Sequence, residues 1–271
     1  QPSFSVSFGY KRKVVSILSK NNFYFNQKNV STDSNFIIWL QMKNTPLIYC
    51  ILFLSIIMGG KVQAQDWPNL NKYQNENANL TPVASGEKRI VFMGDSITEF
   101  WSIANPEYFA GKPYVNRGIS AQTTPQMLIR FRADVIAIKP AVVIILAGIN
   151  DIAGNTGPTR LDRIANNIFS MAELAQANQI KVILCSVLPA YDFSWKPDQS
   201  PAEKVVALNK MIQNYADTNG ILYLDYFSAM NDERNGLKAA YSGDGVHPNK
   251  MGYQVMEPLA EKAITALLAK K

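Results

Sequence analysis

Five short apolar runs alternate along the chain with stretches in which apolar residues recur at helical spacing. Each run is continuous rather than alternating, which is typical of strands covered on both faces by helices. Repeated alternation of strand and helix predicts an α/β domain of three layers, α/β/α, built on a five-stranded parallel sheet. The predicted strands are residues 90–93, 114–115, 142–146, 182–184 and 221–224.

The predicted helices have recognisable starts and ends. Thr123 or Thr124 precedes Pro125, which matches the residue preferences at the start of a helix. The last helix begins near Asn249 and is interrupted or kinked at Pro258. Three helices have an apolar stripe that we expect to face the sheet. These stripes are Leu128, Phe131 and Val135; Leu161, Ile164, Ile168, Met171 and Ala175; and Val205, Leu208, Ile212 and Tyr215.

The first apolar run ends abruptly in Gly94-Asp95-Ser96. A serine that directly follows a buried strand lies at the rim where open parallel sheets bind ligands, so Ser96 is a candidate nucleophile. The alternative is that Ser96 or Thr98 only caps the next helix, since serine and threonine are preferred at that position.

The net charge of +6 comes from the N-terminal part of the chain. Of 27 basic and 21 acidic residues, residues 1–64 hold seven basic and one acidic, so the remainder has 20 of each. A neutral body argues against a nucleic-acid partner and against an anionic membrane surface.

Residues 42–64 have the features of a signal peptide, with a basic start at Lys43, an apolar run and small residues before Gln65. The apolar run of about 13 residues is shorter than the ~20 that span a bilayer, which argues against a membrane anchor. We therefore expect a secreted or periplasmic protein without stable membrane insertion after cleavage. Residues 1–41 begin without Met, and we interpret them as an over-extended N-terminus.

Residues 65–86 are polar and rich in asparagine, and we interpret them as an ordered N-terminal extension of a domain at 87–271. Its larger apolar side chains are expected to pack on that domain: Trp67, Leu70, Tyr73 and Leu80.

Cysteine and histidine usage limits the available chemistry. Cys185 is the only cysteine after the leader, which excludes a disulfide within the mature chain and is typical of a small buried apolar residue. His247 is the only histidine. One cysteine and one histidine cannot form a usual zinc site, and no phosphate-binding glycine loop is present, so we expect neither a metal nor another cofactor.

Four blocks of sequence resemble those of the SGNH (GDSL) hydrolase family. They are Gly94-Asp95-Ser96-Ile97-Thr98, Gly118, Gly148-Ile149-Asn150-Asp151 and Asp244-Gly245-Val246-His247. Each block alone is a weak signal, but the four occur in the family's order and the single histidine falls in the fourth. The resemblance implies a flavodoxin-like fold with sheet order 2-1-3-4-5. The first block also lacks the second glycine of a G-x-S-x-G elbow, which argues against an α/β-hydrolase.

Ser96, Asp244 and His247 are the predicted catalytic residues. Ser96 is a poor nucleophile until a base accepts its proton, and His247 is the only imidazole available. Asp244, three residues earlier, can bind the other ring nitrogen and stabilise the imidazolium. The alternative for His247 is a packed surface side chain beside the turn at Pro248.

The resemblance implies an oxyanion hole formed by the backbone N–H groups of Ser96 and Gly118 and by the side-chain amide of Asn150. Gly118 suits this role because the missing Cβ allows close approach, although Gly118 and Asn150 could instead only shape turns. Loss of one such donor typically costs about 10²- to 10³-fold in kcat, which we expect for Asn150→Ala. Asp95 and Asp151 are assigned to hydrogen bonding within their loops.

Aromatic residues are concentrated in the loop at 189–197. Tyr191, Phe193 and Trp195 either bind a sugar or an acyl chain as part of a substrate site, or pack the loop. Phe100 and Trp101 are predicted to lie in the core.

Together these features predict a secreted serine ester hydrolase that removes short acyl groups, such as acetyl from carbohydrate, through an acyl-enzyme on Ser96. The expected partner is a small-molecule or carbohydrate ester. A lysophospholipase or thioesterase acting on acyl lipids is the alternative enzyme, because the family includes both. A carbohydrate-binding module without catalysis, using the same cleft, is the alternative of another class.

Overall fold

The computed structural model of the protein describes residues 66–197 and 199–269, which lie within one compact unit, Ala64–Lys271. The predictions for residues 1–41 and for the signal peptide at 42–64 lie outside the described residues.

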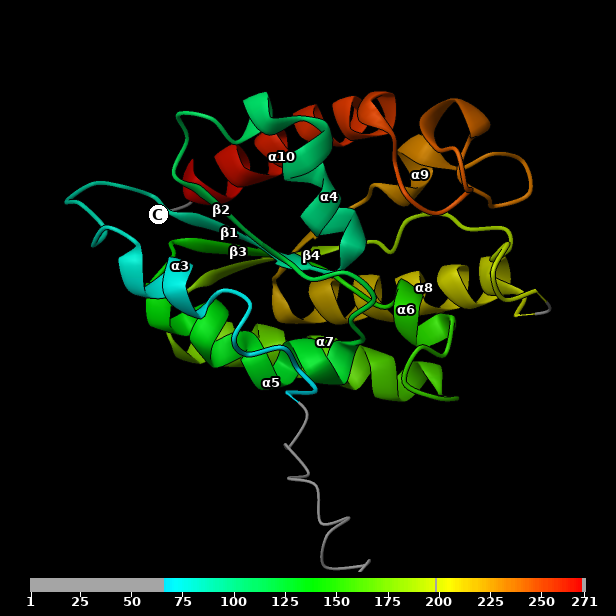
Figure 1. Cartoon of the computed structure of the whole chain (residues 1–271), viewed down its shortest axis with the longest axis horizontal. Helices are drawn as coiled ribbons and strands as arrows, with labels where there is room; N and C mark the ends of the chain where they lie inside the picture. The colour runs from blue at the N-terminus through cyan, green and yellow to red at the C-terminus, as the bar shows by residue number, and fades with distance from the viewer. Residues whose placement is uncertain (1–65, 198, 270–271) are drawn as a thin grey trace, which may run out of the picture. The chain divides into compact units, whose positions relative to one another are not determined.

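A five-stranded parallel sheet forms the centre of the unit, as the continuous apolar runs predict (Figure 1). The strands are β1 (Ile90–Gly94), β2 (Tyr114–Gly118), β3 (Val142–Leu146), β4 (Lys181–Cys185) and β5 (Leu222–Leu224). Their order is β2-β1-β3-β4-β5, which confirms the flavodoxin-like arrangement. In the register of the sheet, Gly94 lies opposite Gly118 on one side and Leu146 on the other, so these strands end together at one edge.

Helices cover both faces of the sheet. In Figure 1, α4 and α10 lie on one face and α5, α7 and α8 on the other. No helix in the described parts of the chain is both long and apolar enough to cross a membrane. The helices are α3 (Gln74–Asn79), α4 (Ser96–Ala104), α5 (Thr124–Asp134), α6 (Ile149–Ile152), α7 (Leu161–Ala177), α8 (Pro201–Asn219), α9 (Phe227–Met230) and α10 (Lys250–Ala269).

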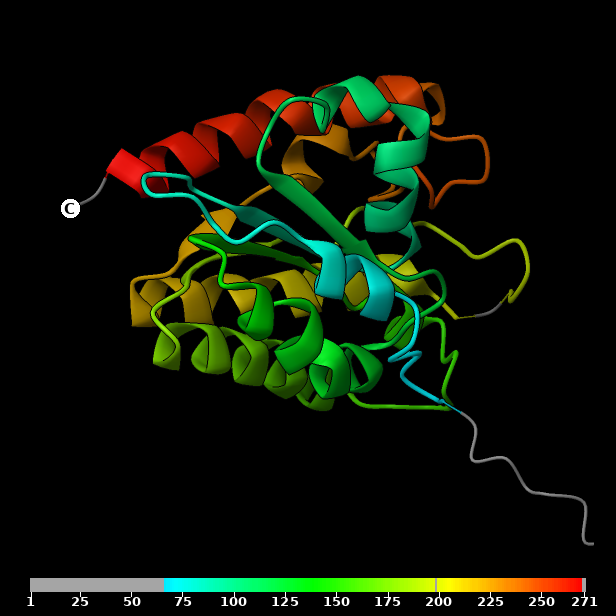
Figure 2. The ribbon, with the colours of Figure 1, turned by 60° about the vertical axis from the view of Figure 1, so that its left-hand side comes forward.

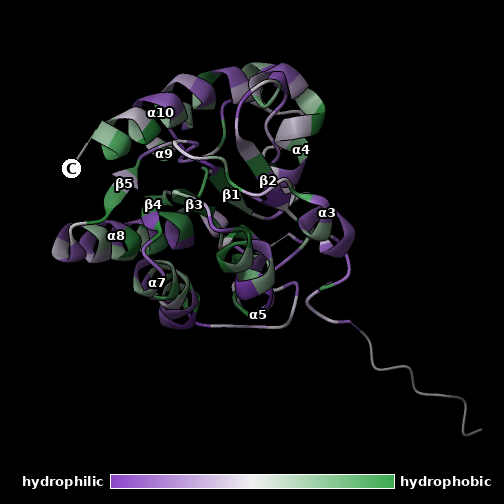
Figure 3. Ribbon diagram, turned by 90° about the vertical axis from the view of Figure 1, so that its left-hand side faces the viewer, coloured by the Kyte–Doolittle hydropathy of each residue, from purple (hydrophilic) through white to green (hydrophobic). Residues whose placement is uncertain are grey.

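The core lies between the sheet and the two helix layers, where the hydrophobic strands are enclosed (Figure 3). Every residue of β1 and β3 is buried. Cys185 is buried at the end of β4, as expected, and burial raises the pKa of its thiol. The helix α10 continues through Pro258, so this proline does not end the helix.

The stripe predicted for α5 is partly wrong. Phe131 and Val135 are buried, but Leu128 is only half-buried, and Met127 and Arg130 occupy the inward face with them. The inward face of α5 therefore includes a charged residue, Arg130, which an apolar stripe does not predict. In the stripe of α7, Ile164, Ile168, Met171 and Ala175 are buried as predicted, and Leu161 at its start is partly buried.

The N-terminal extension contacts the domain through hydrogen bonds and through part of its predicted apolar set, since Leu80 packs partly buried against the core. Tyr73 is buried, and its hydroxyl donates to the carbonyl of Gly118, whereas Trp67 and Leu70 are exposed. The Nε2 of Gln122 donates to Pro68 O at 2.7 Å. The short helix α3 packs beside α5 (Figure 2).

Candidate active site

Ser96 is the first residue of α4, directly after the turn that follows β1. The helix is capped by Asp95, whose Oδ1 accepts from Ile97 N at 2.9 Å, so neither Ser96 nor Thr98 is the cap. Because Asp95 provides the cap, the hydroxyl of Ser96 is left for another partner. A Cβ on Gly94 would overlap Thr98 Oγ1 and lie 2.7 Å from Leu146 O, so this tight turn requires glycine.

The structure brings Ser96, His247 and Asp244 together, although 151 residues separate the serine from the histidine. Ser96 Oγ lies 2.9 Å from His247 Nε2, and His247 Nδ1 lies 2.6 Å from Asp244 Oδ2. An ionised carboxylate can only accept, so Nδ1 donates to Asp244 and Nε2 is left to accept the serine proton.

The backbone and Ser242 hold Asp244 in place. Its Oδ1 accepts from Val246 N at 2.9 Å, from His247 N at 2.8 Å and from Ser242 Oγ at 3.1 Å. Partial burial alone would raise the pKa of Asp244, but the hydrogen bonds from His247 and Val246 lower it to about 2. The carboxylate is therefore ionised at any pH where an imidazole can act as a base.

Two half-exposed aromatic rings flank His247. The ring of Phe100 lies 5.4 Å from the imidazole and is 37% exposed, while Trp195 lies 6.3 Å away at 29° and is 50% exposed. The prediction that Phe100 lies in the core is wrong, because Phe100 is four residues after Ser96 and so shares its face of α4. Trp101 is buried as predicted.

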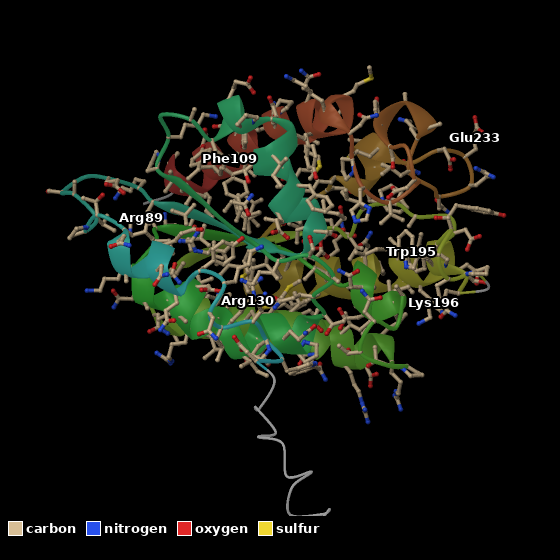
Figure 4. All side chains as sticks on the ribbon, viewed as in Figure 1. Arg89, Phe109, Arg130, Trp195, Lys196 and Glu233 are labelled. Atoms are coloured by element: carbon tan, nitrogen blue, oxygen red, sulfur yellow. The ribbon has the colours of Figure 1, made fainter. Side chains whose placement is uncertain are left out.

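The aromatic loop divides into three different environments. Phe193 has no exposed surface, so of the two alternatives given for this loop it packs the loop and does not face a substrate. Tyr191 is half exposed, but the Arg234 guanidinium lies over its ring at 4.4 Å. Of these three residues only Trp195, which is labelled in Figure 4, has its ring stacked on that of His247, the candidate base.

The predicted oxyanion role of Gly118 is not supported by its contacts. Its N–H donates to Asn116 Oδ1 at 2.8 Å, and its carbonyl accepts from Tyr73. A Cβ at this position would overlap Glu99 N and lie 2.7 Å from Asp95 O. Gly118 is therefore required for the close approach of β2 to the first turn of α4.

The backbone of Ala121 and Gln122, three and four residues after Gly118, lies beside the side chain of Asn150. Asn150 Nδ2 donates to Gln122 O at 3.1 Å, and Asn155 Nδ2 donates both to Asn150 Oδ1 and to Ala121 O. Ala121 has a φ of 64°, which is uncommon for alanine, and in the described part of the chain its N–H donates no hydrogen bond. Sequence reasoning missed Ala121 because its residue type does not indicate this backbone conformation.

Asp95 makes the local hydrogen bond predicted for it, whereas Asp151 bonds a segment outside its own loop. Asp151 accepts from Thr124 N at 2.9 Å and from Thr124 Oγ1 at 2.7 Å, which joins α6 to the start of α5. Burial raises the pKa of Asp95 to about 7 and that of Asp151 to about 6. Neither carboxylate bonds the histidine. Within residues 66–197 and 199–269, no three acidic, histidine or cysteine side chains cluster as a metal site.

We expect Asp95→Asn to flatten the pH dependence of stability. With its pKa raised to about 7, Asp95 is protonated in the folded protein when it is ionised in the unfolded chain. Its contribution to the free energy of unfolding is complete below about pH 4 and is lost as the pH rises to about 7; a shift of about 3 units corresponds to roughly 4 kcal/mol. Asparagine keeps the capping oxygen but not the charge.

Urea unfolding of both proteins between pH 4 and pH 8 measures this effect. The wild type should lose more stability than Asp95→Asn over that interval, and identical slopes would contradict the assignment. Asp151, which is unchanged in both proteins, contributes in the same direction.

Several known proteins are similar to this chain in sequence and in fold. An acetylxylan esterase from Geobacillus stearothermophilus is 28% identical over 207 residues, which are 64% of this chain and 92% of the esterase. The structure of a protein from Bacteroides fragilis, assigned as an acylhydrolase, is 48% identical with a TM-score of 0.73 and covers 74% of this chain and 98% of its own. A GDSL-like lipase from Bacteroides thetaiotaomicron is 46% identical with a TM-score of 0.71, covering 73% and 98%.

The family model described as GDSL-like lipase/acylhydrolase matches residues 92–255. This range contains Ser96, Asn150, Asp244 and His247 and spans more than half of the chain. The protein therefore belongs to the GDSL-like lipase/acylhydrolase family and is a hydrolase of ester bonds.

Proposed function

We propose that Ser96, His247 and Asp244 form the catalytic triad of an esterase that removes acetyl and other short acyl groups from carbohydrate. The observation that carries this proposal is the continuous pair of contacts from Ser96 Oγ to His247 Nε2 and from His247 Nδ1 to Asp244. This is the arrangement that a serine hydroxyl needs to become a nucleophile at neutral pH.

In the proposed reaction, Ser96 Oγ attacks the ester carbonyl while its proton passes to His247 Nε2. Asp244 stabilises the resulting imidazolium through Nδ1. The imidazolium then protonates the leaving alcohol as the carbon–oxygen bond breaks, which leaves the acyl group on Ser96. Water, deprotonated by His247, releases the acid and restores the serine hydroxyl.

The oxyanion would be bound by the N–H groups of Ser96 and Ala121 and by Asn150 Nδ2. The first N–H groups of a helix have no acceptor within it, which leaves Ser96 N free to donate. Ala121 N is also free, and Asn150 Nδ2 has a second hydrogen beyond the one given to Gln122 O. Donors of this kind are most effective when they are fixed before the charge develops.

A carbohydrate leaving group is supported by the two exposed rings beside His247 and by the acetylxylan esterase relative. Exposed aromatic faces suit the apolar face of a sugar ring, and the leaving alcohol must pass close to the imidazole that protonates it. A long acyl chain would instead need an extended apolar groove. Of the two rings, Trp195 has the larger exposed fraction.

A series of p-nitrophenyl esters from acetyl to palmitoyl tests the acyl preference. We expect kcat/KM to be highest for acetyl and to fall as the chain lengthens. A maximum at long chains would favour the alternative lysophospholipase or thioesterase activity. Absence of hydrolysis for every ester would favour the non-catalytic binding module.

We expect Trp195→Ala to lower kcat/KM on an acetylated xylo-oligosaccharide by about 2- to 12-fold, which corresponds to one lost ring contact of 0.5–1.5 kcal/mol. The loss on p-nitrophenyl acetate should be smaller, because that ester lacks the sugar. Tyr191→Ala is the matched control: it removes an equally exposed ring of the same loop that packs under Arg234. Equal losses for the two variants on the sugar ester would contradict a special role for Trp195.

The leader is part of the same proposal. A signal peptide at residues 42–64 would direct the esterase out of the cytoplasm, leaving the extension at 65–86 and the domain at 87–271 as the mature protein. N-terminal sequencing of the mature protein should then begin at Gln65, and a start upstream of Met42 would contradict this assignment.

A further inference from the structure

Arg130 lies at the centre of a buried polar cluster on the side of the sheet opposite α4 (Figure 4). The side chain has no exposed surface. All three guanidinium nitrogens are bonded: Nη1 to Asp134 Oδ2 at 3.0 Å, Nε to Gln122 Oε1 at 2.6 Å and Nη2 to Gly94 O at 2.9 Å. We call Arg130, Asp134, Gln122 and Gly94 the Arg130 cluster.

Two members of the Arg130 cluster hold the segments that carry the proposed catalytic groups. Gly94 is the last residue of β1 and lies two residues before Ser96. Gln122 lies one residue after Ala121, and its carbonyl accepts from Asn150 Nδ2 at 3.1 Å. A single side chain thus bonds both to the turn that presents the nucleophile and to the loop that holds the amide of Asn150.

We propose that Arg130 is a positioning residue that sets the distance between Ser96 and the oxyanion donors at Ala121 and Asn150. The proposal rests on the triad and the oxyanion hole proposed above. Hydrogen-bond donors stabilise an oxyanion only when they lie about 2.7–3.1 Å from it, so small shifts of the loop relative to the serine are costly. Arg130 resists such shifts because its rigid planar group holds three acceptors in a fixed arrangement, whereas the three donors of a lysine ammonium rotate on a flexible stem.

A purely stabilising role would not require this geometry. A buried ion pair contributes little net stability, because both charges must leave water. The ion pair with Asp134 neutralises the charge of Arg130. The second carboxylate oxygen of Asp134, Oδ1, accepts a hydrogen bond from Asn77 Nδ2 of the extension at 2.7 Å. The other two hydrogen bonds of Arg130, to Gln122 Oε1 and to Gly94 O, join segments of the proposed site, and the proposed positioning role depends on them.

Arg89 offers a matched control. It is also buried, and it donates to the carbonyls of Ile138 and Thr81 at 2.9 and 2.6 Å. It lies before the first residue of β1, at the end of the strand away from Gly94 and Ser96. Replacing it tests the loss of a buried arginine without touching the proposed site (Figure 4).

The test is a double-mutant cycle with Asn150→Ala. Arg130→Lys and Arg130→Met, with Arg89→Lys and Arg89→Met as controls, are made in the wild-type and Asn150→Ala backgrounds. Turnover of p-nitrophenyl acetate and the folded fraction are measured for each. We expect the Arg130 variants to lower kcat by about tenfold or more with KM changed less than about threefold, since the interaction is made in the transition state.

In the Asn150→Ala background the same Arg130 substitutions should cost clearly less than in the wild type, because one of the two donors that they displace is already gone and only Ala121 N remains to be shifted. The Arg89 variants should leave kcat per folded molecule unchanged. If Arg130→Met does not fold, Gln122→Met removes the acceptor of Arg130 Nε, together with the bond from Gln122 Nε2 to Pro68 O, and should show the same loss of additivity with Asn150→Ala.

Two results would overturn the inference. One is a double variant whose fold-loss in kcat equals the product of the losses of the Arg130 and Asn150 single variants. The other is a loss of activity in the Arg130 variants that is explained by their folded fraction alone, as expected for the Arg89 variants. If Asn150→Ala leaves kcat unchanged, Asn150 is not part of the oxyanion hole. That result overturns the inference together with this part of the proposed function. The first two results leave the proposed function standing.

Discussion

Replacing Ser96 with alanine is expected to lower kcat for p-nitrophenyl acetate by about 10⁶-fold, which is the scale seen when a serine hydrolase loses its nucleophile. The only hydroxyl within bonding distance of His247 Nε2 in the described structure is that of Ser96. The variant should fold normally, because Asp95 rather than Ser96 caps α4. Residual turnover would come from the oxyanion donors and from binding alone.

Ser102→Ala is the matched control for this change. Ser102 lies on the same helix, and its hydroxyl donates to Glu99 O at 3.1 Å within that helix. It should keep wild-type turnover. A Ser96→Ala protein that folds and retains more than about one per cent of kcat would contradict the assignment of the nucleophile.

Asp244→Asn is expected to lower kcat by about 10⁴-fold while the fold is retained. The carboxylate accepts the Nδ1 proton, and an amide that donates instead would favour the tautomer with its proton on Nε2, which cannot act as a base. Because hydrogen bonding holds the pKa of Asp244 at about 2, its protonation should not limit activity above about pH 4.

Asp232→Asn provides the control for Asp244. Asp232 is a carboxylate of the neighbouring loop that accepts from Arg234 N and Gly236 N without reaching the histidine. It should retain turnover close to the wild type. A loss below about tenfold for Asp244→Asn would show that another group orients His247.

The sheet could be predicted because its strands are buried on both faces and so appear as continuous apolar runs. The helix α5 shows where this reasoning stops. Hydrophobic periodicity placed Leu128 on its inner face, but the inner face contains Arg130, whose burial depends on acceptors supplied by Gly94, Gln122 and Asp134. Those acceptors come from segments far apart in sequence, so their convergence has no local signal.

The candidate site divides in the same way. Ser96, Asp244 and His247 could be placed together because the chain has one histidine, and a nucleophile needs a base. Gly118 was assigned wrongly because glycine serves close packing as well as exposure of a backbone N–H, and the sequence does not distinguish the two. Ala121 is revealed only by its backbone conformation.

An acyl-enzyme on Ser96 can be detected by intact-protein mass spectrometry during turnover of an activated acetyl ester, quenched in acid and followed by peptide mapping. We expect a transient adduct of one acetyl group on the peptide that contains Ser96, which accumulates when deacylation is slowed and is absent from Ser96→Ala. Turnover without an adduct, or an acetyl group mapped to another residue, would contradict an acyl-enzyme on Ser96.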